Sequence, residues 1–377
     1  MKIFNLRLAL SLSLIFMFNF EVNAQNSTIE EVIVSAEKRD ESLQDISQAV
    51  SALTDSDLEN KNIESFVDLS AIVPGVTVSK NEGYKTVISI RGVGNETNQN
   101  AIAAPSVAFH IDGVFIASPF SLLSDFIDID RIEVLRGPQG TLFGQNSTGG
   151  AINVISKKPT TDDYYGKADV TLGNYDLLKY RSSVNIPINE KVATRFSFSS
   201  TERDGFSENI VNGQDLDDAN NLSLRSDWVI ETSETSSLRI FAQYFDIDRN
   251  GAAMRGIDDQ TAGIRHLAQD TLSNQELTSK VFAAIYEQDL GYANLKILAS
   301  SQEDDISVTR DNDRHNLGET VAAIPGLEGT TYIKAEFRPE TSLVETKTLE
   351  VNLISNEPIL NGKLDWVAGA FYMDHKI

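Results

Sequence analysis

The second half of the chain, residues 166–377, alternates apolar and polar residues with a period of two. In one stretch, for example, Leu349, Val351 and Leu353 alternate with polar neighbours such as Glu350. Successive side chains of a β-strand point to opposite faces, so each such segment has one apolar and one polar face. Strands of about ten residues with an apolar outer face and a polar inner face are what a transmembrane β-barrel requires.

The same pattern predicts about nine strands, joined by connections that alternate in length. The strands are expected to begin near Lys167, Leu177, Val192, Asn220, Ser237, Glu276, Tyr292, Glu345 and Leu364. The short connections are Pro187–Lys191, Glu231–Ser236, Asp289–Tyr292 and Asn356–Lys363, and the long ones are Asp204–Ala219, Arg249–Gln275 and Asp304–Val344. Bacterial barrels have short periplasmic turns and long outer loops, so the long loops are expected outside. A soluble β-sandwich is the alternative.

Residues Ile129 to Pro159 join two shorter strands through a segment rich in turn residues. The strands are expected at Ile132–Arg136 and Ala151–Ser156. Because glycine permits positive φ and proline favours a turn, the segment between them should be a compact, reversing β structure. Its turn residues are Gly137, Pro138, Gly140, Gly144, Gly149 and Gly150.

Two earlier strand signals precede this segment in a fixed order. Val87–Gly92 ends in Ile-Arg-Gly, Val107–Val114 ends in Asp-Gly-Val, and Leu-Arg-Gly-Pro follows at Leu135–Pro138. These motifs and their spacing resemble the plug domain of TonB-dependent outer-membrane receptors. The resemblance implies an α+β plug domain over residues 40–160, followed by antiparallel transmembrane β-barrel strands over residues 166–377.

Two helices are expected within the plug region. Leu43–Leu58 has helical spacing, and Thr54–Asp57 could cap a helix start. A second, shorter helix is expected over Ser65–Ala71; Pro74-Gly75 ends it, and a strand begins at Val76.

The resemblance also implies that the barrel is incomplete. Barrels of this family have 22 strands, whereas the pattern here predicts about nine. A sheet with open edges leaves backbone N–H and C=O groups unsatisfied in lipid. The sequence stops shortly after Phe371-Tyr372-Met373, within an expected strand. We therefore expect a fragment that does not transport by itself.

The N-terminus has the features of a signal peptide over residues 1–24. Lys2 and Arg7 precede an apolar run from Leu8 to Phe20, and Ala24 ends a small-residue cleavage site. The run is shorter than the roughly 20 apolar residues that a membrane-spanning helix needs. The mature protein is expected to be exported and to begin at Gln25.

The chain is acidic and lacks cysteine, with a net charge of −23. Loss of Lys2, Arg7 and Glu21 with the signal peptide removes a net charge of +1 and leaves −24. Nucleic acids and anionic lipid surfaces need clustered basic residues, so neither is an expected partner. Without disulfides, stability must come from burial or strand pairing.

The first mature residues, 25–39, contain a strand-like segment with no expected partner strand nearby. It consists of Glu30, Glu31, Val32, Ile33, Val34, Ser35 and Ala36. Its position between a signal peptide and a plug-like region resembles the TonB box, which receptors offer to a TonB-type energy-coupling protein. An exposed strand can bind by adding to a partner's sheet edge. An ordinary first strand of a soluble domain is the alternative.

Two kinds of plug residue are candidate functional residues. The resemblance implies that Arg91 and Arg136 form ion pairs with barrel glutamates; a local partner such as Glu133 is the alternative. The loops 95–105 and 117–124 are expected at the outward apex of the plug and could touch ligand, although they could simply be turns. The ligand candidates are Asn95, Glu96, Asn98, Ser118 and Phe120.

No catalytic, cofactor or metal site is expected. Asp246–Gly251 matches the first half of a calcium loop, but Ile257 stands where a bidentate acid is needed. The acidic group Asp215, Asp217 and Asp218 is better interpreted as a solvated loop. The histidines, which lack metal-ligand spacing, are His110, His266, His315 and His375. No nucleophile–base pair stands in a recognisable frame, so an enzyme is not expected.

The combined features favour an energised importer in the outer membrane of a Gram-negative bacterium. Its partners would be a TonB-type protein, outer-membrane lipid and a small ligand such as a ferric siderophore or another organic nutrient. A β-rich binding or adhesion protein of the cell surface or periplasm is the rival hypothesis.

Overall fold

The computed structural model describes residues 33–35, 38–39, 41–44, 46, 48–81, 85–94, 105–118, 120–256, 259–311, 314, 340–362 and 364–377. All of them belong to one compact unit, Ile33–Ile377. Several predictions lie outside the described residues: the signal peptide, Glu30 to Val32, Ala36, Asn95, Glu96 and Asn98. Within the described ranges, no helix is long and apolar enough to cross a membrane.

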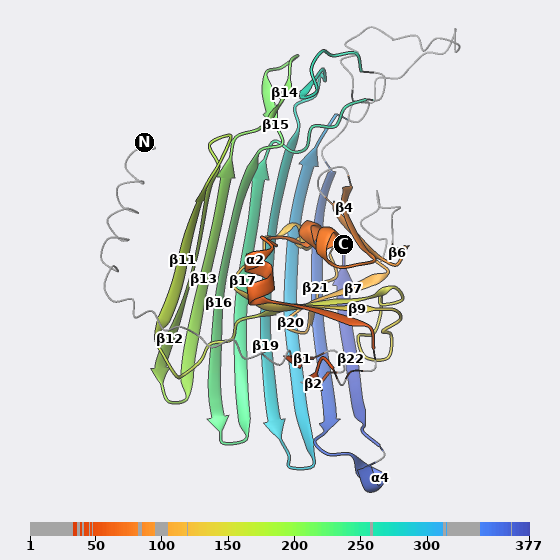
Figure 1. Cartoon of the computed structure of the whole chain (residues 1–377), viewed down its shortest axis with the longest axis vertical. Coiled ribbons are helices and arrows are strands. Elements are labelled where there is room, and N and C mark those ends of the chain that lie inside the picture. The colour runs from red at the N-terminus through yellow and green to blue at the C-terminus, as the bar shows by residue number, and fades with distance from the viewer. Residues whose placement is uncertain are drawn as a thin grey trace. The chain divides into compact units, whose positions relative to one another are not determined.

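A nine-stranded antiparallel sheet dominates the part of the chain that the structure describes. Figure 1 shows its strands side by side, coloured from green to blue. Each strand pairs with the next in chain order, which confirms the predicted antiparallel barrel strands, and the sheet is not closed. The strands are β11 (Tyr165–Leu172), β12 (Leu178–Asn189), β13 (Val192–Arg203), β16 (Ala219–Ser233), β17 (Ser236–Arg249), β19 (Asn274–Asp289), β20 (Ala293–Thr309), β21 (Glu340–Ser355) and β22 (Val367–Lys376).

Several strands run well past the ten residues expected from the sequence pattern. The longest, β20, has 17 residues, so the predicted loop start at Asp304 is wrong and the strand continues to Thr309. The first two long connections also contain a small sheet at the end opposite the short turns (Figure 1). Its strands are β14 (Ser207–Asn209), β15 (Gln214–Leu216) and β18 (His266–Leu267).

The two faces of the large sheet differ as the alternation predicts. On β16, Arg225 and Asp227 are buried against the plug, whereas Leu224, which precedes Arg225, is 40% exposed on the other face. The inner face is not wholly polar, because Phe241, Leu298 and some neighbours join the plug's apolar core. The plug therefore replaces water along part of this wall.

The plug is built around a five-stranded mixed sheet in the order β3-β9-β10-β7-β8. Strands β9 and β10 contain the two predicted strands and pair antiparallel, and β7 pairs with β10 in parallel. The strands are β3 (Val50–Thr54), β7 (Val107–Ile111), β8 (Val114–Phe115), β9 (Ile129–Arg136) and β10 (Gly150–Ser156). Two smaller sheets accompany it, formed by β1 (Ile33–Val34) with β2 (Glu41–Ser42), and by β4 (Val76–Asn81), β5 (Lys85–Ile90) and β6 (Val93–Gly94).

The short helices correct one prediction. Thr54 caps α2 (Asp55–Asn60) through a capping box with Asp57, as predicted. The helix does not extend back to Leu43, because Val50–Thr54 form β3 and pair with β9. This distant strand pairing outweighs the local helical spacing. The second predicted helix is present as η2 (Phe66–Asp68) and α3 (Leu69–Ile72); η3 (Ser121–Leu123) and α4 (Ile359–Gly362) complete the helices described.

Phe66 lies at the centre of the plug core and provides a test of it. Its ring meets Phe109 and Phe126 edge-on, with centroid distances of 4.4 and 4.5 Å. Phe66→Ala should lower the free energy of plug opening by about 3–5 kcal/mol, because it leaves a cavity among buried rings. Hydrogen exchange of plug amides in the detergent-solubilised chain measures this energy.

Phe282→Ala is the matched control, since Phe282 is 52% exposed on the outward face of β19. It should leave exchange in the plug unchanged. Equal exchange in the two variants would contradict the assignment of Phe66 to the core.

Candidate functional site

The plug touches the barrel wall through the tight turn between β7 and β8. Asp112 and Gly113 both have positive φ, 52° and 83°, which suits the Asp-Gly pair in a type I′ turn. The turn points Asp112 at the wall, where its carboxylate accepts hydrogen bonds from Arg225 (2.6 Å) and Arg239 (3.2 Å). The backbone N–H of Ser156 donates a third, at 3.0 Å.

Asp227 of β16 completes this buried cluster. Its carboxylate lies 3.0 Å from the Arg225 guanidinium and 2.6 Å from that of Arg239. Two carboxylates thus balance two guanidinium groups, and all four side chains are buried. We call this group, Asp112, Arg225, Asp227 and Arg239, the plug lock. Burial alone would raise the pKa of Asp112, but Arg239 and Arg225 lower it, to about 2.

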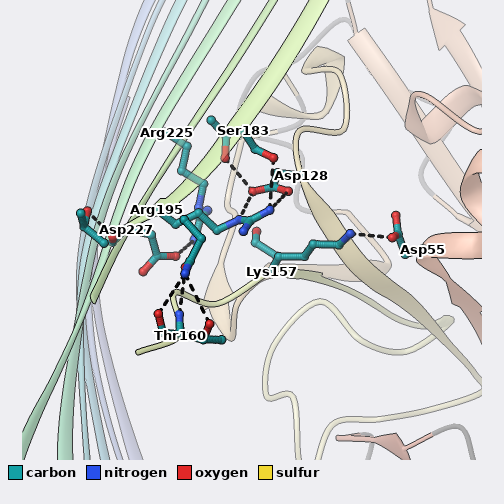
Figure 2. Close-up of polar contacts among 12 residues, drawn as sticks. Asp55, Asp128, Lys157, Thr160, Ser183, Arg195, Arg225 and Asp227 are labelled. Carbon is teal, nitrogen blue, oxygen red and sulfur yellow. Dashed lines mark hydrogen bonds and ion pairs between the residues drawn. The ribbon is translucent and has the colours of Figure 1, made fainter. Parts of the chain in front are cut away.

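A second contact joins the plug to β13. Asp128 accepts hydrogen bonds from two guanidinium nitrogens of Arg195 and, at 2.7 Å, from the Ser197 hydroxyl. Figure 2 shows Asp128 facing Arg195, while Lys157 reaches away to Asp55 on the plug itself. The Asp128 carboxylate therefore bonds to the wall, through Arg195 and Ser197.

A third contact lies between Glu64 and β12, where Lys179 is 2.9 Å and Arg181 3.4 Å from the carboxylate. Taken with Asp112 and Asp128, it shows that the plug presents acids to basic residues of β12–β17.

Along β21 and the connection that follows it, the plug contributes the basic partner and the wall the acidic one. There Lys38 pairs with Glu350 (2.9 Å), Lys85 with Glu340 (3.6 Å), and Arg39 with Asp365. Near η3 the plug contributes an uncharged group: the Ser121 hydroxyl donates a hydrogen bond to Asp304 of β20 at 2.7 Å. The wall is thus basic on one side and acidic on the other.

The two predicted plug arginines make none of these contacts. Arg91 is exposed, has a positive φ, and donates its backbone N–H to Gly75. The side-chain Nε of Arg136 is buried without a hydrogen-bond partner among the described residues. No ion pair links either arginine to a carboxylate in the described ranges, so their pairing with barrel glutamates stays a prediction. Glu133, the local alternative, pairs with Arg131 instead.

The described part of the coupling segment is attached to the plug. Contrary to expectation it has a partner strand, since Ile33 and Val34 of β1 pair with β2. The Glu133 carboxylate accepts hydrogen bonds from the Ser35 backbone N–H (2.8 Å) and hydroxyl (3.2 Å). Ile33 is half-exposed, whereas Val34 and Glu133 are fully buried. The described part of the segment is therefore held against the plug by strand pairing and by Glu133.

Of the apex candidates, Ser118 and Phe120 fall within the described residues, and both are buried. Phe120 packs in a cluster with Phe245, Leu277 and other wall residues. The Ser118 hydroxyl accepts a hydrogen bond from the Phe120 backbone N–H at 3.3 Å. A contact of either residue with ligand stays a prediction.

Other acidic groups considered in the sequence have local roles. Asp246 lies within β17 and accepts from Tyr244 and Thr278, so it does not belong to a metal-binding loop. Asp218 accepts from the backbone of Asn250. Across the described ranges, no group of three or more His, Asp or Glu residues could hold a metal ion.

Comparison with known proteins fits this geometry. Residues 42–151 match the TonB-dependent receptor plug domain. The iron-regulated outer membrane virulence protein of Vibrio cholerae is 33% identical over 157 residues, covering 40% of this chain and 24% of that protein. The pesticin receptor of Yersinia pestis is 30% identical over 172 residues, covering 44% and 24%.

Solved receptor structures share the fold. The ferric yersiniabactin uptake receptor of Yersinia pestis matches with a TM-score of 0.71 at 16% identity, over 87% of this chain and 48% of that one. The alcaligin outer-membrane receptor of Bordetella pertussis gives 0.64 at 14% identity, over 91% and 49%. The chain spans about half of these solved chains, and its sequence matches span 24% of those two relatives.

A plug domain that packs against barrel strands with an apolar outer face is the architecture of an outer-membrane receptor. By these matches the chain belongs with the TonB-dependent receptors of Gram-negative outer membranes, and it covers the plug and part of the barrel.

Removal of the Asp112 charge should loosen the plug. Asp112→Asn leaves two buried guanidinium groups with Asp227 alone, which should cost about 3 kcal/mol of plug attachment. Protease protection of the plug in the detergent-solubilised chain reports the loss. Asp130→Asn is the control, because Asp130 is half-exposed and, among the described residues, forms its ion pair with Arg131; it should cost about 0–1 kcal/mol. Equal protection in both variants would refute the plug lock.

The plug lock should also respond to acid in a defined window. The folded-state pKa of Asp112 lies below its ordinary value of 3.8, so its contribution of about 2 kcal/mol is complete above pH 4. It should disappear as the pH falls from about 4 to about 2. Hydrogen exchange of the plug across this range, compared with Asp112→Asn, isolates the contribution. An identical acid response in the two proteins would contradict it.

Proposed function

We propose that the chain belongs to an energised importer that takes up a scarce ligand across the outer membrane. The supporting observation is a plug with sheets of its own, held against the inner face of a barrel wall by buried ion pairs as well as apolar contacts. At its N-terminal side, Ser35 next to β1 bonds to Glu133. The ionic contacts can exchange for water when the plug moves.

The outer face of the wall supports a membrane location over the rival binding or adhesion protein. Large apolar side chains are exposed there, including Leu224, Phe282, Leu349 and Tyr372. An exposed apolar surface of this kind is what lipid-facing strands require, and a soluble protein would cover it.

The proposed sequence of events begins with ligand at the outer loops and the plug apex. Binding there releases the segment that contains Ile33, and a TonB-type protein captures it by strand addition. Force on the segment then moves the plug. In this proposal the plug's contacts with the wall set the force needed, and no covalent chemistry takes place.

The proposed ligand is a ferric siderophore or another organic nutrient. The names of similar proteins refer to ferric yersiniabactin uptake, alcaligin and vitamin B12, and these three compounds form a panel of probes. Because β11 and β22 leave open sheet edges, we further propose that transport requires additional strands that close the barrel. The chain alone would not transport.

Strand addition by the coupling segment can be tested with proline. Ile33→Pro in the complete receptor removes a backbone N–H and disfavours strand pairing. It should abolish uptake of the panel compounds and leave their binding to the cell surface unchanged. Asn26→Pro, in the leader before the segment, is the control and should import normally. Unchanged uptake by Ile33→Pro, or by a deletion of Glu30 to Ala36, would contradict energised transport.

A further inference from the structure

One connection at the short-turn end of the wall differs from the others. Residues 190–191, 234–235 and 290–292 each join neighbouring strands in two or three residues, whereas residues 356–366 join β21 to β22. Figure 1 shows α4, which belongs to this longer connection, beyond the ends of the strands. The connection therefore projects from the rim of the wall, at the end that the short turns mark as periplasmic.

Hydrogen bonds hold the projecting connection in place. Ile359 and Leu364 exchange backbone hydrogen bonds of 2.8 and 3.1 Å, which close the chain around α4. At the start of the connection, Asn356 donates its backbone N–H to the carbonyl of Tyr292 and its side-chain amide to Asp289 at 2.7 Å. The connection is therefore tied to the neighbouring turn between β19 and β20.

This projection exposes a group of apolar side chains. Ile359 is 47%, Leu360 68% and Leu364 43% exposed, and we call these three residues the apolar tip. Single exposed apolar residues are ordinary, but a group of them is typical of a surface that another molecule covers. Leu360 also has a positive φ of 54°, a costly conformation for a bulky side chain. Both features indicate an interaction surface.

The charges beside the apolar tip favour a protein over lipid as the partner. Glu357 and Asp365 flank the tip, and both are exposed. With Lys363, residues 356–366 carry a net charge of −1. Anionic lipid surfaces attract basic segments rather than acidic ones. A protein surface with an apolar hollow and a basic border has the complementary chemistry.

The apolar tip lies close to the residues that follow the coupling segment. Arg39 pairs with Asp365 at 2.9 Å and donates a hydrogen bond to the carbonyl of Trp366 at 3.0 Å. Ile33 is six residues before Arg39, so at most roughly 20 Å of extended chain separates the two. A small domain is about 30 Å across. One protein that pairs with the strand at Ile33 can therefore also reach the tip.

We propose that the apolar tip is a second docking site for the TonB-type coupling protein, on the barrel wall rather than on the plug. This inference rests on the proposed function and adds a contact with the same partner. Two linked contacts raise the effective concentration for the second binding event. A coupling protein seated on the tip therefore captures the coupling segment more readily, and its contact with the wall does not depend on movement of the plug.

A dye attached at the apolar tip tests which partner covers it. Leu360→Cys places the label at the most exposed of the three residues, and no cysteine of this chain competes for it. The complete receptor is labelled with an environment-sensitive dye and reconstituted in vesicles that contain brominated phosphatidylcholine, which quenches a dye in contact with lipid. Addition of the purified soluble part of a TonB-type protein should shift the dye emission to the blue, and the lipid should not quench it.

Ile188→Cys is the matched control, because Ile188 is 51% exposed near the same end of β12. Its dye should be quenched by the brominated lipid and should not respond to the coupling protein. Quenching at Leu360→Cys to the same degree would assign the apolar tip to the membrane and overturn the proposal. An unchanged emission at Leu360→Cys in the presence of the coupling protein would overturn it as well.

Affinity and uptake separate this inference from the proposed function. Leu360→Ser in the complete receptor should weaken binding of the coupling protein by roughly tenfold, because it removes an apolar side chain that docking buries. It should also lower uptake of ferric yersiniabactin, ferric alcaligin or vitamin B12. Ile188→Ser should change neither quantity. Since Leu360 is exposed, hydrogen exchange of the plug should be the same as in the unaltered receptor.

Comparison with Ile33→Pro distinguishes the two possible failures. If Ile33→Pro abolishes uptake and Leu360→Ser leaves the affinity for the coupling protein unchanged, the apolar tip is not a docking site and the proposed function stands. If neither substitution changes uptake, energised transport is rejected, and the docking site is rejected with it.

Discussion

The buried contact between Asp112 and the two arginines Arg225 and Arg239 is the constraint on which the rest of the plug's placement depends. Four ionic side chains are removed from water at this point, and each is tolerable only because the others are present. The tight Asp-Gly turn brings the carboxylate to the wall, and the alternation of β16 places Arg225 and Asp227 on the same face. The turn conformation, the alternation of β16 and the ion pairs therefore all favour the same position of the plug.

The remaining polar contacts are distributed around that point. Asp128 and Glu64 hold the plug to the first strands of the wall through basic partners. The N-terminal residues are tied both to the plug, through Ser35 and Glu133, and to the wall, through Lys38 and Arg39. The plug is therefore held to the wall on two sides.

The sequence predicted the features that depend on local pattern. Alternation located most strand starts within three residues, and Thr54 with Asp57 marked the start of α2. It failed where a distant partner decided the outcome: Val50–Thr54 became a strand by pairing with β9, and Ile33 found a partner in β2. The plug lock joins residues 113 positions apart, which no local signal specifies. Arginines at inward positions of an alternating strand, such as Arg195 and Arg225, were the one available hint.

The division of charge along the wall has a consequence for how the plug is seated. Basic residues face the plug from β12 to β17, and acidic residues face it from β21 and the connection that follows. A plug rotated about the barrel axis would bring its carboxylates toward Glu340 and Glu350, and like charges so placed repel. The charge pattern of the wall therefore favours one orientation of the plug about the barrel axis. In the proposed import cycle, the same pattern would return a displaced plug to that orientation.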